Sequence, residues 1–192
     1  MKKLCPTETG WCVWITGLPG SGKSVVSEAF LALLSENRVS AQLLSSDALR
    51  RVITPKPTYS LDEREVVYAS LVYVASLLTQ NGVNVIIDAT GNLRRYRDIA
   101  RRQMTRFIEA YLKCPLDVCI ERERKREKTY HAPRRIYAQA LKHKGSTVPG
   151  VGQPYEEPLN PEIVLDASAC SPRECAEAIW KKIMQMESED EK

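Results

Sequence analysis

The chain has 192 residues, of which 43% are apolar and 27% charged, with a formal net charge of +4. This length suits one domain with a buried core, and the composition is that of a globular protein rather than a disordered one. No apolar run approaches the roughly 20 residues that cross a bilayer, so we expect no membrane span and no membrane partner.

The first residues, MKKLCPTETGW, contain two lysines but no apolar segment after them. The six cysteines form no CxxC pair. We therefore expect no secretory signal, reduced thiols and a cytoplasmic location.

Five short apolar segments predict strands, at 11–17, 41–47, 83–90, 107–114 and 162–167. Helical spacing predicts helices between them, at 25–37, 60–82, 94–106, after Pro115 and after Ser171. Ser60 and Glu63 have the spacing of a capping box, and Gly82 lies where the C-terminal cap of that helix belongs. Strands that alternate with helices predict crossover units and a parallel sheet.

The segment from 128 to 158 has no regular pattern and is rich in Gly and Pro. It is too long for an ordinary connection within a compact domain. We therefore predict a single domain over 1–192 with a lid at about 128–158.

Residues 17–24 read GLPGSGKS and match G-x-x-x-x-G-K-[ST] in full. The motif lies between an apolar strand and a helix, which is the context of a phosphate-binding P-loop. Its backbone N–H groups form an anion nest, its Lys reaches the terminal phosphates and its Ser holds Mg²⁺. We predict ATP and Mg²⁺ as ligands, and as nucleotide contacts Gly17, Leu18, Pro19, Gly20, Ser21, Gly22, Lys23, Ser24 and Val25.

The fold expected from these features is α/β, a P-loop nucleotide-kinase-like three-layer sandwich with a five-stranded parallel sheet. The chain lacks the NKxD motif of GTPases and the LSGGQ segment of transporter ATPases. It is also too short for a motor with a separate output domain. A kinase for a small molecule or a polynucleotide is therefore the best class.

A kinase needs a carboxylate beside the acceptor hydroxyl and cations for the transferred phosphate. Asp47 follows the second strand, so we assign it as general base or Mg²⁺ partner, with Arg50 as an acceptor ligand one helical turn later. Asp88 ends the third strand as a Walker B carboxylate would, and we assign it to the metal.

Other arginines are candidates for binding the two substrates. Arg64, Arg94 and Arg97 are candidates for binding the acceptor, and Arg122, Arg124 and Arg126 are candidates for the nucleotide side of the lid. Because these last three occupy alternate positions of one helix, at most two of them face the site together.

Five strings resemble the adenylylsulfate kinase (APS kinase) family: SSDALR, SLDER, RRYRDIAR, PLDVCIER and QPYEEPLNPEIVLDA at 153–167. The resemblance implies transfer of the ATP γ-phosphate to the 3′-hydroxyl of adenosine 5′-phosphosulfate (APS), which forms PAPS. It implies that Asp47 is the base, that Arg50 and Arg64 bind the phosphosulfate, and that Tyr59 stacks on the acceptor adenine. It also implies that Lys144 is a catalytic and substrate-binding lysine of the lid.

The departures from the family pattern concern the acceptor. Ser45 replaces the first acid of D-G-D, Val67 replaces an Asn, ATGNL at 89–93 replaces F-I-S-P-Y, and Ser146 replaces a second stacking Phe. Loss of one stacking face costs on the order of 1–3 kcal/mol if no other residue replaces it.

Two alternatives to APS phosphorylation therefore stay open. The first is a related P-loop kinase that acts on a polynucleotide 5′-OH end or a nucleotide-linked metabolite, although nucleic acid is not the expected partner. The second is a nucleotide-binding regulatory protein without transfer activity. The resemblance further implies a homodimer in many members, which Trp180 and Met184 could form, although a Trp and a Met four residues apart more often face the core.

Overall fold

A computed structural model describes residues 9–129, 132–142 and 146–190. Its centre is a five-stranded, all-parallel sheet in the order β2-β3-β1-β4-β5. The strands are β1 (Cys12–Thr16), β2 (Ala41–Ser45), β3 (Asn84–Asp88), β4 (Phe107–Lys113) and β5 (Ile163–Asp166). This confirms the predicted α/β fold and the predicted number of strands.

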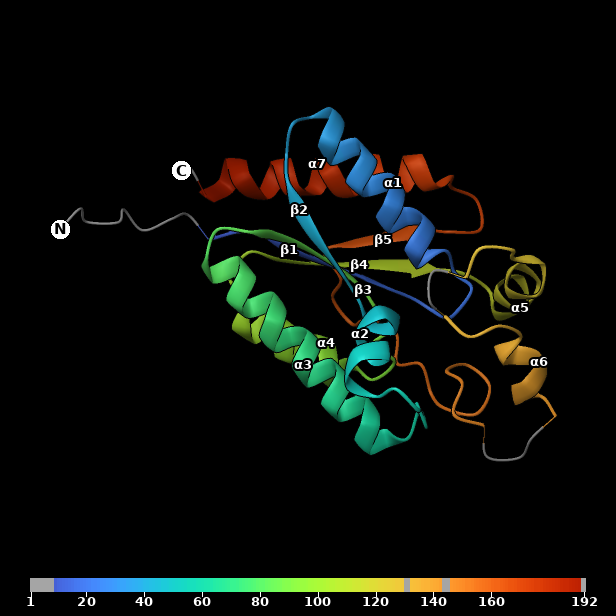
Figure 1. Cartoon of the computed structure of the whole chain (residues 1–192). Helices are drawn as coiled ribbons and strands as arrows, with labels where there is room; N and C mark the ends of the chain where they lie inside the picture. The colour runs from blue at the N-terminus through green and yellow to red at the C-terminus, as the bar shows by residue number, and fades with distance from the viewer. Residues whose placement is uncertain (1–8, 130–131, 143–145, 191–192) are drawn as a thin grey trace.

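Helices cover both faces of the sheet (Figure 1). One face carries α1 (Lys23–Glu36) and α7 (Pro172–Asp190), and the other carries α3 (Leu61–Gln80) and α4 (Arg94–Gln103). The shorter helices α2 (Ser46–Ile53), α5 (Leu116–Lys125) and α6 (Ile136–Ala140) lie at the end of the sheet where the strands terminate. Ligands of open α/β sheets bind at this end.

The two faces of β1 show why the strands are continuous apolar runs. Trp11 and Phe30 pack in the core beneath α1 and α7, with ring centroids 6.1 Å apart. Trp14 and Tyr68 pack in the core beneath α3 and α4, with ring centroids 6.2 Å apart. Because successive side chains alternate between two dry faces, the strand is apolar up to its last residue, Thr16.

The predicted helix caps are present. Ser60 Oγ accepts from Glu63 N at 3.2 Å, and Gly82 has φ 78° just beyond α3. At the start of α7, Ser171 and Glu174 form both bonds of a capping box, at 3.2 and 2.7 Å.

The second strand is shorter than predicted. Ser45 Oγ accepts from Ala48 N at 3.4 Å and acts as the N-cap of α2. Asp47 therefore lies in the first turn of a helix and not at a strand end, as the strand prediction for 41–47 had it. A carboxylate at this place is stabilised by the helix dipole.

The second half of the predicted lid is bound to the body. Asn92 Nδ2 donates to Pro154 O at 3.1 Å, and Glu156 N donates to Asn92 O at 2.8 Å. Arg97, which is 1% exposed, donates to Glu156 O at 2.6 Å and pairs with Glu109 at 2.5 Å. We call residues 153–158 the return segment and do not include it in the lid proposed below.

Among the helices in the three described ranges, none has the length and apolarity needed to cross a bilayer. Trp180 on α7 is partly buried against the core, whereas Met184 is 48% exposed. The homodimer through these residues stays a prediction.

Candidate active site

Two glycines give the P-loop its path between β1 and α1. Gly22 has φ 102° and is the N-cap of α1, and the space around its missing side chain is open. Gly20 has φ 83°, and a Cβ there would lie 2.3 Å from Cys119 O. Positive φ favours glycine at both positions, and the close approach of Cys119 O favours it at Gly20 in addition. The loop thereby presents the N-terminus of α1 to the cavity as an anion-binding end.

Lys23, the lysine of the G-x-x-x-x-G-K-[ST] motif, lies folded over this loop. Its Nζ donates to Gly17 O at 3.1 Å and to Leu18 O at 3.0 Å. Burial lowers the pKa of Lys23, and the charges of Asp88 and Asp47 oppose that shift. An ammonium at this loop is suited to neutralise the charge of a phosphate that the loop binds.

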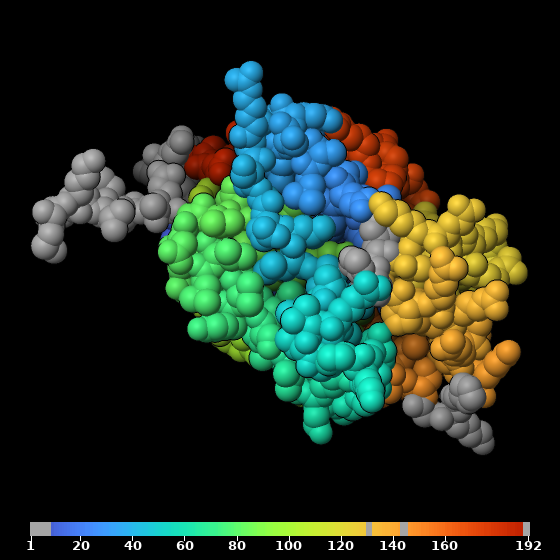
Figure 2. Space-filling model, viewed as in Figure 1, coloured from blue at the N-terminus to red at the C-terminus, as the bar shows by residue number. Residues whose placement is uncertain are grey.

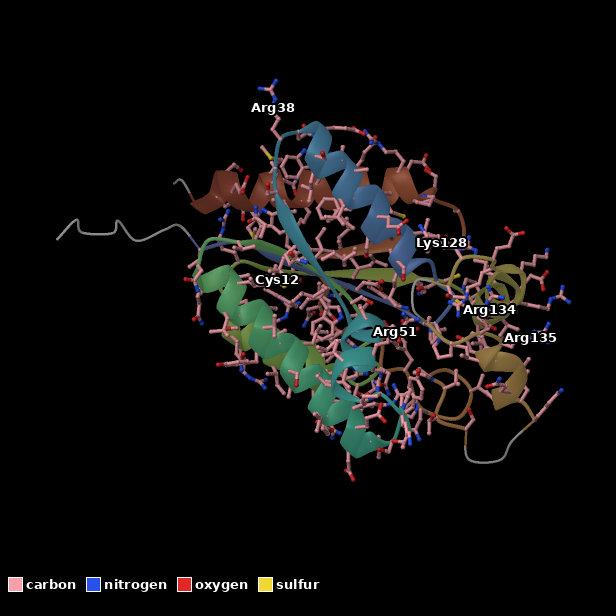
Figure 3. The ribbon with its side chains drawn as sticks, viewed as in Figure 1. Cys12, Arg38, Arg51, Lys128, Arg134 and Arg135 are labelled. Carbon is pink, nitrogen blue, oxygen red and sulfur yellow. The ribbon has the colours of Figure 1, made fainter. Side chains whose placement is uncertain are left out.

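A cavity of about 660 Å³ joins the P-loop to two walls. The first wall comes from α2, the loop after it, α3 and the end of β3, and the second comes from α5, α6 and residues 146–149. In Figure 2 the cyan surface of α2 and the yellow-to-orange surface of α5 and α6 face each other at this end of the molecule. Figure 3 shows Arg51, Lys128, Arg134 and Arg135 around the same end, while Arg38 lies far from it.

The wall formed by α2 and α3 holds the residues assigned to the acceptor. Asp47, Arg50 and Tyr59 all line the cavity, and the Arg50 guanidinium lies 4.7 Å from the centroid of the Tyr59 ring. Tyr59 has φ 57°, a left-handed conformation that a bulky residue rarely adopts. This unusual backbone sets the ring against the guanidinium and the cavity.

Glu63 holds this wall together. Its carboxylate forms an ion pair with Arg50, and both side chains are less than 10% exposed, at 6% for Arg50 and 9% for Glu63. The same carboxylate accepts from Thr58 Oγ1 at 2.7 Å and from Tyr59 N at 3.0 Å. Burial alone would raise the pKa of Glu63, but the bonds from Thr58 and Tyr59 and the charge of Arg50 outweigh it and lower the pKa.

Arg64 connects three segments around the cavity. Its guanidinium donates to Tyr59 O at 3.2 Å, to Asn92 Oδ1 at 3.4 Å and to Thr147 O at 2.6 Å. Arg64 is 5% exposed and lines the cavity. It therefore ties the acceptor wall to residue 147, in the last part of the predicted lid.

The opposite wall brings two of the three α5 arginines inward. Arg122 and Arg126 line the cavity. Arg124 points outward and pairs with Glu121 at 2.9 Å, with 72% of its side chain exposed. The helical period therefore separates the three as expected, with positions i and i+4 on one face.

The oxygen ligands available at the P-loop are those that Mg²⁺ prefers. Asp88 is 7% exposed, accepts a hydrogen bond from the Ser24 side chain and shares the cavity with Asp47. Burial raises the pKa of Asp88, and Lys23 and Ser24 oppose the shift. The described residues contain no cluster of three or more His, Cys, Asp or Glu side chains arranged to hold a metal. Mg²⁺ in kinases needs no such cluster, because it takes one or two carboxylates together with substrate phosphates and water.

The structure gathers most of the predicted site residues and separates a few. Pro19 to Val25, Asp47, Arg50, Tyr59, Arg64, Asp88 and Arg122 line the cavity. Gly17 and Leu18 are not among the lining residues and instead accept bonds from Lys23. Lys144 lies outside the described residues.

Arg94 departs from its assignment as an acceptor ligand. Its Nε donates to Glu157 O at 2.8 Å and its backbone N to Glu156 Oε2 at 2.8 Å, and it does not line the cavity. Arg94 therefore anchors the return segment, because its helix faces that segment and not the P-loop. Arg97, the other acceptor candidate on this helix, is also absent from the cavity lining, because its guanidinium is buried against Glu109 and Glu156 O.

The sequence patterns do not predict the roles of two residues in the site. The capping-box pattern predicts Glu63 only as a helix-capping residue, yet its carboxylate also binds Arg50. Tyr137 lies in a segment predicted to be irregular, yet it is fully buried and its hydroxyl donates to Pro19 O at 2.8 Å. The capping box pointed to Glu63 as a fixed side chain, whereas no pattern in the sequence indicated Tyr137.

Known proteins are similar to this chain in both sequence and fold. The family model described as adenylylsulphate kinase matches residues 9–166. A probable adenylyl-sulfate kinase from Pyrococcus abyssi is 32% identical over 177 residues, covering 92% of this chain and 97% of its own. An adenylyl-sulfate kinase from Rippkaea orientalis is 31% identical over 179 residues, covering 93% of this chain and 94% of its own.

Among solved structures, an APS kinase from Mycobacterium tuberculosis in complex with AMPPNP and APS aligns with a TM-score of 0.79 and 30% identity. The alignment covers 92% of this chain and 98% of that one. The family match extends from the P-loop strand through β5, so it includes the P-loop, the α2–α3 wall and the α5–α6 wall of the cavity. The chain belongs to the adenylylsulphate kinase family.

Proposed function

We propose that the protein transfers the γ-phosphate of ATP to the 3′-hydroxyl of APS and so forms PAPS. The observation that carries this proposal is the single cavity that joins the P-loop to Asp47, Arg50 and Tyr59. Both substrates of a direct phosphoryl transfer need to meet in one space that excludes water. Membership of the family makes APS the first acceptor to test.

Each residue of the cavity is proposed to have a separate role in the phosphoryl transfer. Lys23 and the N-terminus of α1 bind the phosphates of ATP, and Arg122 and Arg126 supply positive charge on the nucleotide side. Asp47 accepts the proton of the attacking hydroxyl. Arg50 binds the anionic part of the acceptor, and the Tyr59 ring stacks on the adenine of the acceptor.

Ser24 and Asp88 would hold Mg²⁺, and Asp47, the alternative metal partner, is proposed to act as the base. The ion, when bound, neutralises charge on the β- and γ-phosphates. Asp88 orients the Ser24 hydroxyl through their hydrogen bond.

Residues 128–148 form the proposed lid. The described part of this segment places Ala132, Pro133 and Ile136 in the cavity wall. Tyr137 fastens it to Pro19 of the P-loop. Lys144 is proposed to approach the transferred phosphate from the lid.

A second acceptor class stays a candidate because of the wall that faces Tyr59. Ser146 lines the cavity where the family pattern has a stacking Phe, and Val67 is fully buried where it has an Asn. Tyr155 does not replace the missing ring, since its hydroxyl lies 3.0 Å from Thr16 Oγ1 and its ring stacks on Tyr111. The acceptor of the alternative would be a polynucleotide 5′-OH end or a nucleotide-linked metabolite.

The test is ADP release from ATP and Mg²⁺ with APS, with 5′-OH oligonucleotides or with CDP-linked metabolites. A strong APS-dependent rate that Lys23→Ala abolishes would support the proposal, and product analysis would identify PAPS. A rate that only another acceptor stimulates would overturn APS as the substrate but would still support kinase activity. ATP turnover that no acceptor stimulates would favour a regulatory nucleotide-binding protein.

A further inference from the structure

Asn92 is a buried polar residue to which the proposed reaction assigns no role. It lies between β3 and α4 and is fully buried. Its side chain accepts from Arg64 Nη1 at 3.4 Å through Oδ1 and donates to Pro154 O at 3.1 Å through Nδ2. Its backbone oxygen accepts from Glu156 N at 2.8 Å. Asn92 therefore links the acceptor wall to the return segment.

Backbone hydrogen bonds hold the turn at Asn92 without help from its side chain. Gly91 N donates to the Tyr68 hydroxyl at 3.1 Å, and Gly91 O accepts from the buried guanidinium of Arg97. The bond from the return segment to the backbone oxygen of Asn92 adds a third connection. Loss of the amide group should therefore affect its partner Arg64 more than the path of the backbone.

The amide oxygen of Asn92 is one of three protein acceptors around the Arg64 guanidinium. The other two are Tyr59 O, at 3.2 Å from Nε, and Thr147 O, at 2.6 Å from Nη2. A guanidinium carries five N–H groups, so the bonds within the described residues leave one N–H on Nη1 and one on Nη2. Arg64 lines the cavity, and such a pair of N–H groups matches two oxygens of an oxyanion.

We propose that Asn92 is a positioning residue, which holds the Arg64 guanidinium in the orientation that binds an oxyanion of the acceptor. Asn92 is not among the residues that line the cavity, so it acts through Arg64. It is also the only side chain among the three acceptors, because Tyr59 and Thr147 contribute backbone oxygens. Fixing the guanidinium before the acceptor arrives lowers the entropy cost of binding.

This inference rests on the proposed phosphoryl transfer and on Arg64 as an acceptor ligand. The experiment is steady-state kinetics with ATP, Mg²⁺ and APS. Asn92→Ala should raise KM for APS by about tenfold, the size expected for one hydrogen bond to a charged group. KM for ATP and kcat should change by less than about twofold, because the P-loop and Asp47 do not contact Asn92.

Asn84→Ala is the matched control. Asn84 also uses both ends of its amide, since it accepts from Trp11 N at 3.1 Å and donates to Ser40 O at 3.1 Å. It lies at the start of β3, whereas the cavity is at the other end of that strand. The control should therefore lower the melting temperature and leave both KM values unchanged.

A double-mutant cycle separates positioning from general support of the fold. Arg64→Ala should raise KM for APS by more than Asn92→Ala does, and Asn92→Ala added to it should raise KM by less than about twofold more. Asn92→Ser is used if Asn92→Ala does not fold. Its hydroxyl is shorter than the amide and withdraws the acceptor from Arg64, so the same KM change is expected.

Three results would overturn the inference alone. The first is an unchanged KM for APS in the folded Asn92 variant. The second is an equal rise in KM for APS and for ATP. The third is the same effect of the Asn92 change with and without Arg64, which would mean that Asn92 only supports the fold. If the unchanged protein phosphorylates no anionic acceptor, the proposed function fails, and this inference fails with it.

Discussion

At the scale of single residues, the cavity places two carboxylates near Lys23 in different surroundings. Asp47 lies in the first turn of α2, whereas Asp88 is buried at the end of β3 against Ser24. These surroundings suit different roles, since a base needs contact with the acceptor and a metal ligand needs contact with the phosphate loop.

Asp47→Asn should lower kcat by about 10²-fold or more and leave ATP affinity largely unchanged, because an amide cannot accept the hydroxyl proton. Steady-state kinetics with a separate measurement of nucleotide binding would check this. Asp62→Asn, a change to an exposed carboxylate on α3, is the control and should leave kcat unaltered. Near-normal turnover of Asp47→Asn would show that another group is the base.

Asp88→Asn should raise the melting temperature of the nucleotide-free protein, and the gain should increase with pH. Because burial raises the pKa of Asp88, the folded state holds this proton more tightly than the unfolded state does. The stability that the protonated group provides is complete below the unfolded pKa of about 3.9, and it is lost as the pH rises through the folded pKa. Thermal unfolding of both proteins between pH 4 and 8 measures the difference, and a difference that does not change with pH would contradict this account.

At the scale of elements, the junction between α2 and α3 shapes the acceptor wall. The carboxylate of Glu63 on α3 bonds to Arg50 on α2 and to the loop residues Thr58 and Tyr59. One side chain thus sets the position of two groups that are proposed to bind the acceptor, without contacting the acceptor itself.

Glu63→Gln should raise KM for the acceptor by about tenfold or more, since hydrogen bonds to charged groups contribute about 1.5–3 kcal/mol. The effect on kcat should be smaller, because Asp47 and Lys23 keep their places. Asp62→Asn again serves as the control on the neighbouring residue. A loss confined to kcat, with KM unaltered, would mean that Glu63 acts on the chemical step.

Lid closure should protect particular sites from trypsin. Lys128, Arg134 and Arg135 lie at the cavity end of the molecule, and Arg38 lies far from it after α1 (Figure 3). AMPPNP with Mg²⁺ and acceptor should slow cleavage at the first three residues and not at Arg38, because closure over the phosphates would shield the lid alone. Equal cleavage of the lid with and without ligands, read by mass spectrometry, would rule out closure.

At the scale of the whole molecule, a buried charged network joins the sheet to the return segment. Arg97 on α4 pairs with Glu109 on β4 and donates to the backbone oxygens of Gly91 and Glu156. Arg101 bonds to Glu109 and Glu162, and Glu162 accepts from Glu109 N at 2.7 Å. The family-specific string at 153–167 thus has a structural role, since it fastens the segment after the lid to the sheet.

Arg97→Met should destabilise the protein by about 3–5 kcal/mol, because it leaves the buried carboxylate of Glu109 without its nearest partner. Arg95→Met on the same helix is the matched control and should change stability little, since the Arg95–Glu65 pair is exposed. Urea unfolding measures the change in the free energy of unfolding of each variant, provided that the m-values are equal. Equal midpoints for the two variants would show that the network does not hold the return segment.

The sequence by itself determined the parts of this protein that depend on local patterns. Continuous apolar runs predicted the five strands, the caps at Ser60 and Ser171 predicted two helix starts, and GLPGSGKS predicted the phosphate loop. The string at 153–167 indicated the family. Local structure does not require this particular order of residues, so a match to it reflects common ancestry.

The tertiary structure decided which charged side chains face the cavity. Arg94 and Arg97 have the same chemistry as Arg50 and Arg64, yet the first two bind the return segment and the last two line the cavity. The register of β2 with β3 likewise placed Ser45 beside Asp88, although 43 residues of sequence separate them. The direction of a long side chain and the partner across a parallel sheet depend on contacts distant in sequence, and these exist only once the layers have packed.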